Sequence, residues 1–271
     1  MPDRIEFPSA RPAVGETPSR RGTHVLGAFI DALGWDEVLQ IIRRWAAAGQ
    51  SRYVCCCNAH SLVTTQRDAT VREVIGRADL AVPDGTPVAW MMRRSGFARQ
   101  ARISGPDLMW KYCAVAEAEG SAIFLYGNTA ATLEALRRRL QSAFPRLVVA
   151  GMIAPPFRQL QPEEDLDVVI RINRSGAAVV FVSLGCPKQE LWMAAHRQRI
   201  SAVMIGVGAA FDFHAGSVKR APVWMQHCGL EWLHRLCTEP RRLWRRYLAT
   251  NSQFILGACR QLMAQHWRVP R

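Results

Sequence analysis

Two short apolar segments, each followed by a glycine-containing turn, constrain the fold of this chain most strongly. The segments cover residues 179–184 (VVFVSL) and 202–207 (AVMIGV). The turns that follow are Gly185-Cys186-Pro187-Lys188-Gln189-Glu190 and Gly208-Ala209-Ala210-Phe211-Asp212. A short apolar run before a glycine turn and a helix is typical of a buried parallel strand. Ligands of open α/β sheets bind at the carboxyl ends of such strands, so the polar residues of both turns are site candidates. The alternative is that the turns only connect.

The rest of the chain repeats this alternation of strand and helix as far as about residue 218. The predicted strands cover residues 24–29, 52–57, 80–82, 122–126 and 147–151. The predicted helices between them cover residues 35–47, 61–77, 88–94, 132–143 and 162–173. This order predicts an α/β fold: a Rossmann-like, mainly parallel sheet flanked by helices. After Pro222 the pattern is helical only, which predicts a C-terminal helical appendage of short helices.

Composition divides the chain into three parts: a disordered leader (1–22), an α/β catalytic core (23–218) and a basic helical appendage (219–271). The formal net charge is +13, and the appendage holds ten Lys and Arg against two acids. A basic block of this kind favours an anionic partner. Aromatic and apolar residues interleaved with arginines predict an element that lies on an anionic membrane surface. A helical cap on the core and a homo-oligomer interface are the alternatives.

The sequence also predicts where the protein resides. No apolar run reaches the roughly 18 residues that a membrane-spanning helix needs, and the N-terminus has no hydrophobic signal region. We therefore expect a cytoplasmic protein, peripheral on the inner face of the cytoplasmic membrane.

Several common site motifs are absent from the sequence. There is no phosphate-loop lysine motif, no GxGxxG and no Gly-x-Ser-x-Gly elbow. No Cys and His spacing is typical of zinc, so no metal site is predicted. Phosphate recognition must then use turn amides, helix N-termini and arginine, and the Gly185 turn with Lys188 fits that role.

Asp84 is the best candidate for a general base. It follows an apolar strand and lies between Pro83 and Gly85. A desolvated carboxylate at a strand end has a raised pKa and can take a proton from a hydroxyl. The alternative is that Asp84 caps the next helix.

Three further residues are candidates for substrate binding. The sequence leaves two possible roles open for Arg102 and for Asp212, and one for Gln189. Arg102 holds an anionic substrate or pairs with Asp107. Gln189 does not titrate, which indicates binding rather than proton transfer. Asp212 lies between two phenylalanines and either reads a base edge beside a stacking ring or caps a turn.

Six blocks of this sequence, in order, resemble the WecG/TagA/CpsF family of bacterial glycosyltransferases (glycosyltransferase family 26). The resemblance covers about residues 24–250. The blocks are Asn58-Ala59; Ala78-Asp79-Leu80 with Pro83-Asp84-Gly85; Arg102-Ile103-Ser104-Gly105-Pro106-Asp107-Leu108; the Gly185 turn; Gly206-Val207 with the Gly208 turn; and Lys219-Arg220-Ala221-Pro222 through Gly229-Leu230-Glu231-Trp232, Arg235-Leu236 and Glu239-Pro240-Arg241-Arg242.

The resemblance implies a UDP-sugar-dependent hexosyltransferase that moves a hexose or an N-acetylhexosamine and inverts the anomeric centre. The acceptor would be a polyprenyl-diphosphate-linked sugar in the synthesis of a cell-surface polymer such as an exopolysaccharide, a capsule or a teichoic acid. No cofactor is implied beyond the UDP-sugar substrate. The absence of an Asp-x-Asp pair after a strand also argues against a metal-bound diphosphate.

The same resemblance implies roles for individual residues. Asp84 matches the proposed general base. The residues matching the sugar and diphosphate pocket are Asn58, Arg102 and Gln189, with Cys56 at a neighbouring substrate position. Phe157 and Asp212 match positions around uracil. Arg235, Arg242 and Arg245 match arginines expected to reach the diphosphate when the appendage closes over the site.

Two departures from the family bear on the donor sugar. Cys56 stands where many members have Thr, and His60 stands where many have Glu. Both lie near the sugar pocket, so we hypothesise a neutral hexose such as glucose in place of N-acetylmannosamine or its uronic acid. The acceptor glycan, the linkage position and the oligomeric state do not follow from the sequence.

Two other function classes are alternatives. A nucleotide-sensing or nucleic-acid-binding protein with a basic tail is the main alternative, but it gives no reason for Asp84, Gln189 and Asp212 to lie at strand ends. We therefore expect no nucleic-acid partner. An epimerase would need a dinucleotide fingerprint, which the sequence lacks.

Overall fold

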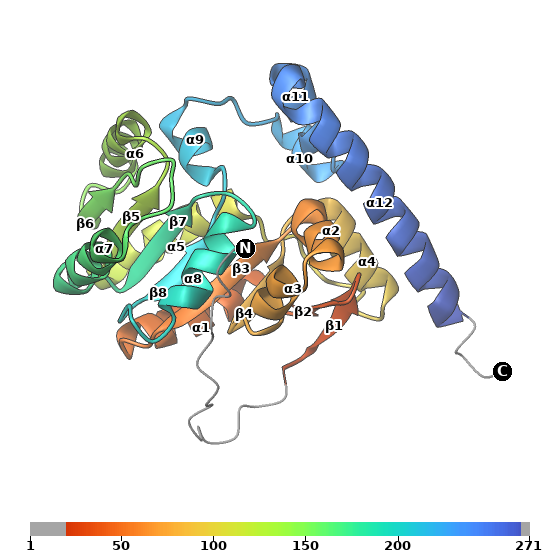
Figure 1. Ribbon diagram of the computed structural model, residues 1–271, viewed down its shortest axis with the longest axis horizontal. Helices are drawn as coiled ribbons and strands as arrows, with labels where there is room; N and C mark the ends of the chain where they lie inside the picture. The colour runs from red at the N-terminus through yellow and green to blue at the C-terminus, as the bar shows by residue number, and fades with distance from the viewer. Residues whose placement is uncertain (1–19, 267–271) are drawn as a thin grey trace.

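Six parallel strands form the central sheet of the computed structural model, which describes residues 20–266 (Figure 1). In spatial order the strands are β4 (Leu80–Pro83), β3 (Arg52–Cys57), β8 (Val203–Gly206), β7 (Val179–Ser183), β5 (Ala122–Gly127) and β6 (Val148–Ile153). The predicted α/β fold with a mainly parallel sheet is confirmed.

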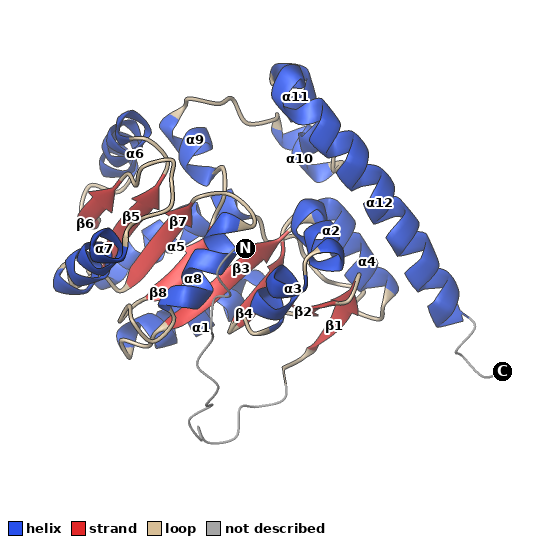
Figure 2. Cartoon of the chain, in the orientation of Figure 1, coloured by secondary structure: helices blue, strands red, loops and turns tan. Residues whose placement is uncertain are grey.

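Nine helices of the described core connect or flank these strands (Figure 2). They are α1 (Trp35–Ala47), α2 (Ala59–Arg67), α3 (Ala69–Gly76), α4 (Thr86–Arg94), α5 (Gly105–Glu119), α6 (Ala130–Ala143), α7 (Pro162–Arg174), α8 (Lys188–His196) and α9 (Ala210–Ala215). The predicted helix over residues 61–77 is two helices, because the Asp68 carboxylate accepts hydrogen bonds from the N–H groups of Thr70 and Val71 and starts a second helix there.

The sheet has a hydrophobic core on each face. Alternate residues of β3 show the division: Tyr53, Cys55 and Cys57 pack into one core, and Val54 and Cys56 pack into the other. The first core is covered mainly by α2, α3, α4, α7 and α8, and the second by α1, α5, α6 and α9. Both faces are therefore buried, as the wholly apolar strand sequences predict.

A β-hairpin precedes the sheet where a single strand over 24–29 was predicted. Its strands are β1 (Gly22–Val25) and β2 (Ala28–Asp31), joined by Leu26 and Gly27, both at positive φ (50° and 86°). Two central residues at positive φ are typical of a tight hairpin turn. Asp31 is buried and bonds to Arg20 and to the N–H of Ala81, so the folded part begins before the predicted boundary at residue 22. The rest of the predicted leader lies outside the described residues.

The appendage consists of α10 (Val223–His227), α11 (Glu231–Thr238) and α12 (Pro240–His266). The last is one 27-residue helix, not the short helices predicted. It lies along the side of the molecule that holds α2 and α4 (Figure 1), and it buries Phe254 and Ala258. The Gln261 amide bonds the hairpin twice, accepting from the N–H of Leu26 (2.8 Å) and donating to the carbonyl of His24 (2.7 Å). The appendage is thus docked on the core by both apolar contacts and hydrogen bonds.

Within residues 20–266, no helix is both long and apolar enough to cross a membrane.

Candidate active site

Polar residues gather where the parallel strands end. Asn58 follows β3, Asp84 follows β4, Asn128 follows β5, and Asp212 lies in α9 just after β8. Because all six strands run in the same direction, these ends meet at one edge of the sheet, which is the usual ligand edge of an open α/β fold.

Asp84 is held at this edge by backbone hydrogen bonds. Its N–H donates to the carbonyl of Cys57 (2.8 Å), and its carboxylate accepts from the N–H of Gly105 at the start of α5. Gly85, at φ +99°, is the N-cap of α4, and no hydrogen bond of the described residues joins the Asp84 side chain to that helix. The alternative role of Asp84 as a cap for α4 is therefore wrong.

The carboxyl group of Asp84 is unusually basic for an aspartate. Although part of the residue is exposed, protein surrounds its carboxyl group, and this burial raises the pKa to about 6. The negative charges of Glu231 and Asp107 raise the pKa further, while Arg102 and the Gly105 N–H oppose the rise. A carboxylate with this pKa is suited to general base catalysis near neutral pH.

Two arginines and two acids form a network beside Asp84. Arg220 binds Asp107 through both terminal nitrogens (2.6 and 2.9 Å). Its Nε donates to Glu231 (3.3 Å), and Arg102 donates to the other Glu231 oxygen (2.7 Å). The sequence offered Asp107 as a partner for Arg102. That alternative is wrong, because Arg220 occupies Asp107 and lowers its pKa by hydrogen bonding, against the effect of burial.

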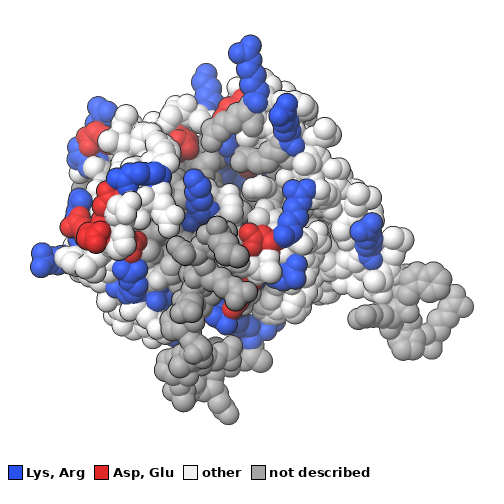
Figure 3. All heavy atoms as spheres, in the orientation of Figure 1, with Lys and Arg blue, Asp and Glu red and all other residues white. Residues whose placement is uncertain are grey.

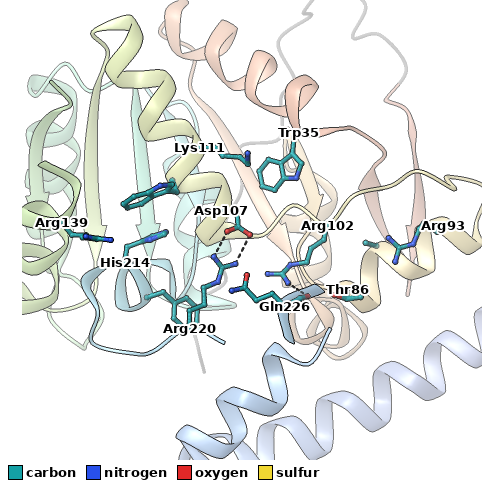
Figure 4. Close-up of a pocket in the computed structure, with 13 residues that line it drawn as sticks. Trp35, Thr86, Arg93, Arg102, Asp107, Lys111, Arg139, His214, Arg220 and Gln226 are labelled. Atoms are coloured by element: carbon teal, nitrogen blue, oxygen red, sulfur yellow. Dashed lines mark hydrogen bonds and ion pairs between the residues drawn. The ribbon is translucent and has the colours of Figure 1, made fainter. Parts of the chain in front are cut away.

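A cleft of about 750 Å³ opens beside this network (Figure 4). Its lining residues are Trp35, Thr86, Ala89, Arg93, Arg102, Asp107, Trp110, Lys111, Arg139, Phe213, His214, Arg220 and Gln226. Five are Arg or Lys, and Asp107 is the one carboxylate among the described lining residues. This excess of positive charge makes the cleft suited to an anionic ligand. Lys and Arg are also spread widely over the face that Figure 3 shows.

Aromatic rings form the far wall of the cleft. Trp110 stacks on His214 (ring centroids 4.8 Å apart), and the Arg139 guanidinium lies 6.0 Å from the centroid of Trp110. Lys111 lies 5.3 Å from the centroid of Trp35. Burial lowers the pKa of His214, so this ring is neutral at physiological pH and contributes no charge.

Gln189 and Cys56 lie inside the protein. Gln189 is 4% exposed; its oxygen accepts from the N–H of Gly208 (3.1 Å) and its nitrogen donates to Glu190 (2.9 Å). The Gln189 amide therefore ties the turns after β7 and β8 together. Cys56 is 5% exposed, and burial raises the pKa of its thiol. Asn58 caps α2, since its side chain accepts from the N–H groups of His60 and Ser61.

The residues predicted around the nucleotide follow β8, β7 and β6 at the same edge of the sheet. Asp212 accepts a hydrogen bond from the Asn128 side chain (2.9 Å), which links the ends of β5 and β8. Phe157, in the loop after β6, is 88% exposed. Gly185 (φ +77°) forms the turn after β7, and Lys188 begins α8. No described contact joins Phe157 to Asp212.

The predicted appendage arginines are not gathered in the cleft. Arg235 lies over the ring of Phe213, 5.4 Å from its centroid, at the cleft border. Arg245 is exposed and lies over Trp244. The side chain of Arg242 lies outside the described residues. Three other residues of the predicted appendage (219–271) lie at the site instead: Arg220 and Gln226 line the cleft, and Glu231 belongs to the arginine network beside it. Sequence reasoning gave these three no role, although Arg220 and Glu231 lie within the motif blocks.

Among residues 20–266, no three side chains of His, Cys, Asp or Glu are grouped so that they could hold a metal ion.

The family model described as "Glycosyl transferase WecG/TagA/CpsF family" matches residues 23–268, which is nearly the whole chain.

Proposed function

Because the chain belongs to the WecG/TagA/CpsF family of glycosyltransferases, we propose that it is an inverting, UDP-sugar-dependent hexosyltransferase. The acceptor is a sugar linked to polyprenyl diphosphate, in the synthesis of a cell-surface polysaccharide. The observation that carries the proposal is Asp84, a carboxyl group with a pKa of about 6 at the ligand edge of the sheet, next to a cationic cleft.

Asp84 acts as the general base. It takes the proton of an acceptor hydroxyl as that oxygen forms its bond to the anomeric carbon of the donor. The bond from this carbon to the β-phosphate oxygen breaks on the opposite face, and the electron pair leaves with UDP. Inversion needs one such carboxylate, and a pKa near the working pH favours the proton transfer.

Arginine and backbone amides stabilise the charge of the departing diphosphate. Arg102 lies beside Asp84 and lines the cleft, and the glycine turn at Gly185 follows β7 at the same edge of the sheet. Preorganised donors of this kind stabilise developing charge without a metal ion. We propose a metal-independent reaction on this ground.

The uracil end of the donor lies toward β5 and β8. Asp212 would read the base edge, with its carboxylate oriented by Asn128, and Phe157 would close over the base from the loop after β6. The Gly185 turn and Lys188 follow β7, the strand between β8 and β5, and we propose that the diphosphate binds beside them.

The appendage brings the enzyme to its lipid-linked acceptor. Trp244, Leu248, Ile255 and Met263 are exposed at helical spacing along α12, on a face that differs from that of the buried Phe254. Arg241 and Arg245 are exposed on the first turns of the same helix. An apolar stripe with arginines at one end is typical of a helix lying in the interface of an anionic membrane. We propose peripheral attachment to the inner face of the cytoplasmic membrane.

A neutral hexose, such as glucose, remains our proposal for the donor. Cys56 is buried, and its thiol is a weak hydrogen-bonding group. His60 Nδ1 lies 3.4 Å from the Thr250 hydroxyl of α12. Turnover of UDP-N-acetylmannosamine alone, and not of UDP-glucose, would contradict this proposal.

A donor screen tests the proposed function. The purified full chain is incubated with a synthetic polyprenyl-diphosphate monosaccharide and a panel of UDP-sugars, and UDP release and product mass are measured. We expect a disaccharide-lipid from one donor. No product from any donor, with folded protein, would contradict the proposed reaction.

A further inference from the structure

Glu231 reaches from the appendage to the arginines of the core site. It is the first residue of α11, where the helix dipole favours a negative charge, and its side chain is 19% exposed. One oxygen accepts from Arg102 (2.7 Å) and the other from Arg220 (3.3 Å). A single appendage carboxylate therefore bridges both arginines next to Asp84.

The appendage alone holds the guanidinium of Arg102. One terminal nitrogen donates to Glu231, and the other donates to the carbonyl of Gln226 in α10 (3.2 Å). These are the hydrogen bonds of Arg102 among the described residues, and both partners belong to the appendage. Docking of the appendage thus decides the direction in which this arginine points.

Arg102 is paired with Glu231 and not with Asp84. No ion pair of the described residues joins Asp84 to Arg102, although Arg102 is close enough for its charge to lower the pKa of Asp84. An arginine paired through two hydrogen bonds would hold Asp84 in its ionised form and make it a weaker base. Arg102 is instead directed to Glu231, while Asp84 receives one hydrogen bond from the Gly105 backbone.

We propose that Glu231 is a positioning residue of the transfer reaction, which holds Arg102 and Arg220 at the cleft wall and prevents Arg102 from pairing with Asp84. This inference rests on the function proposed above. Its consequence is that the docked appendage sets the electrostatics of the core site, in addition to any contact with lipid. The other titratable groups facing Asp84 are Asp107 on α5, which pairs with Arg220, and the thiols of Cys56 and Cys57 on β3.

Glu231→Gln tests the proposal, with Glu73→Gln as a matched control. Glu73 also pairs with an arginine (Arg77, 2.8 Å), but on the exposed surface of α3. The titration midpoint of the Asp84 carboxyl carbon is followed by NMR in the full chain, together with the pH profile of kcat/KM. Loss of the negative charge and release of Arg102 both favour ionised Asp84, so we expect the midpoint to fall by about one pH unit. Turnover near neutral pH should fall about tenfold or more, and the control should match the wild type in both.

An unmoved midpoint in Glu231→Gln would overturn the proposal, even if turnover fell, because loss of the charge and release of Arg102 should both move the titration. Glu231→Asp keeps the charge but is one methylene too short to bridge both arginines, so it separates the position of Arg102 from the charge of Glu231. We expect a lowered midpoint in Glu231→Asp as well, and an unmoved one would refute the positioning role. The titration of Asp84 needs no substrate, so its midpoint reports on Glu231 even in a protein that transfers no sugar. A wild type that transfers no sugar would contradict the proposed function alone.

Discussion

Asp84→Asn should make the protein more stable at neutral pH while removing the proposed base. Folding raises the pKa of this carboxyl from 3.8 to about 6, so the folded state favours the protonated form. The stabilisation from the bound proton is complete below about pH 4 and is lost as the pH rises through about 6. A rise of two units in a pKa corresponds to roughly 3 kcal/mol. Asparagine carries no charge to desolvate, and its oxygen can still accept from the Gly105 N–H.

Urea unfolding of wild type and Asp84→Asn at a series of pH values measures this effect. Most other titrating groups contribute equally to both proteins, so their contributions drop out of the difference in the free energy of unfolding. We expect it to grow in favour of the variant by up to about 3 kcal/mol between pH 4 and pH 7. A difference that stays constant with pH, or that favours the wild type at neutral pH, would refute the raised pKa and the burial that causes it.

Three further predictions concern other parts of the molecule. Gln189→Ala should lower the free energy of unfolding by about 2–3 kcal/mol, because the buried Glu190 and the N–H of Gly208 lose their partner; urea unfolding measures this, and a wild-type midpoint would contradict it. Leu248→Asp should weaken binding to anionic phospholipid vesicles without lowering the melting temperature, since Leu248 is 68% exposed. Unchanged flotation with vesicles would show that this face of α12 does not meet lipid. For the wild type, kcat/KM should fall about tenfold per pH unit below about pH 6, and a flat profile there would exclude Asp84 as the base.

Local signals in the sequence predicted most of the sheet. Each of the six strands is a short apolar run that ends near glycine, proline or a polar residue, and each was found. The hairpin was missed because residues 24–30 read as one nearly continuous apolar segment, in which Gly27 alone marks the turn. Helix α5 had no predicted counterpart, since its start at Gly105-Pro106 also reads as a turn.

The clearest sequence signal marked the candidate site residues that follow strands. Asp84 could be found because Pro83 and Gly85 place it directly at a strand end. The roles of Glu231 and Arg220 could not be found, because their partners lie far away in the chain: Arg102 is 129 residues from Glu231, and Asp107 is 113 residues from Arg220. Sequence spacing carries no signal for such contacts, which depend on how the appendage docks.

The most direct test of the account compares wild type with Asp84→Asn in two measurements on the same preparations. These are the initial rate of sugar transfer with the donor found in the screen, and UDP binding by calorimetry. We expect the rate to fall by about 10²–10⁴-fold, the usual contribution of a general base, with UDP affinity unchanged. A variant that keeps near-wild-type turnover, or that loses UDP binding along with its activity, would contradict the assignment of Asp84 as the base.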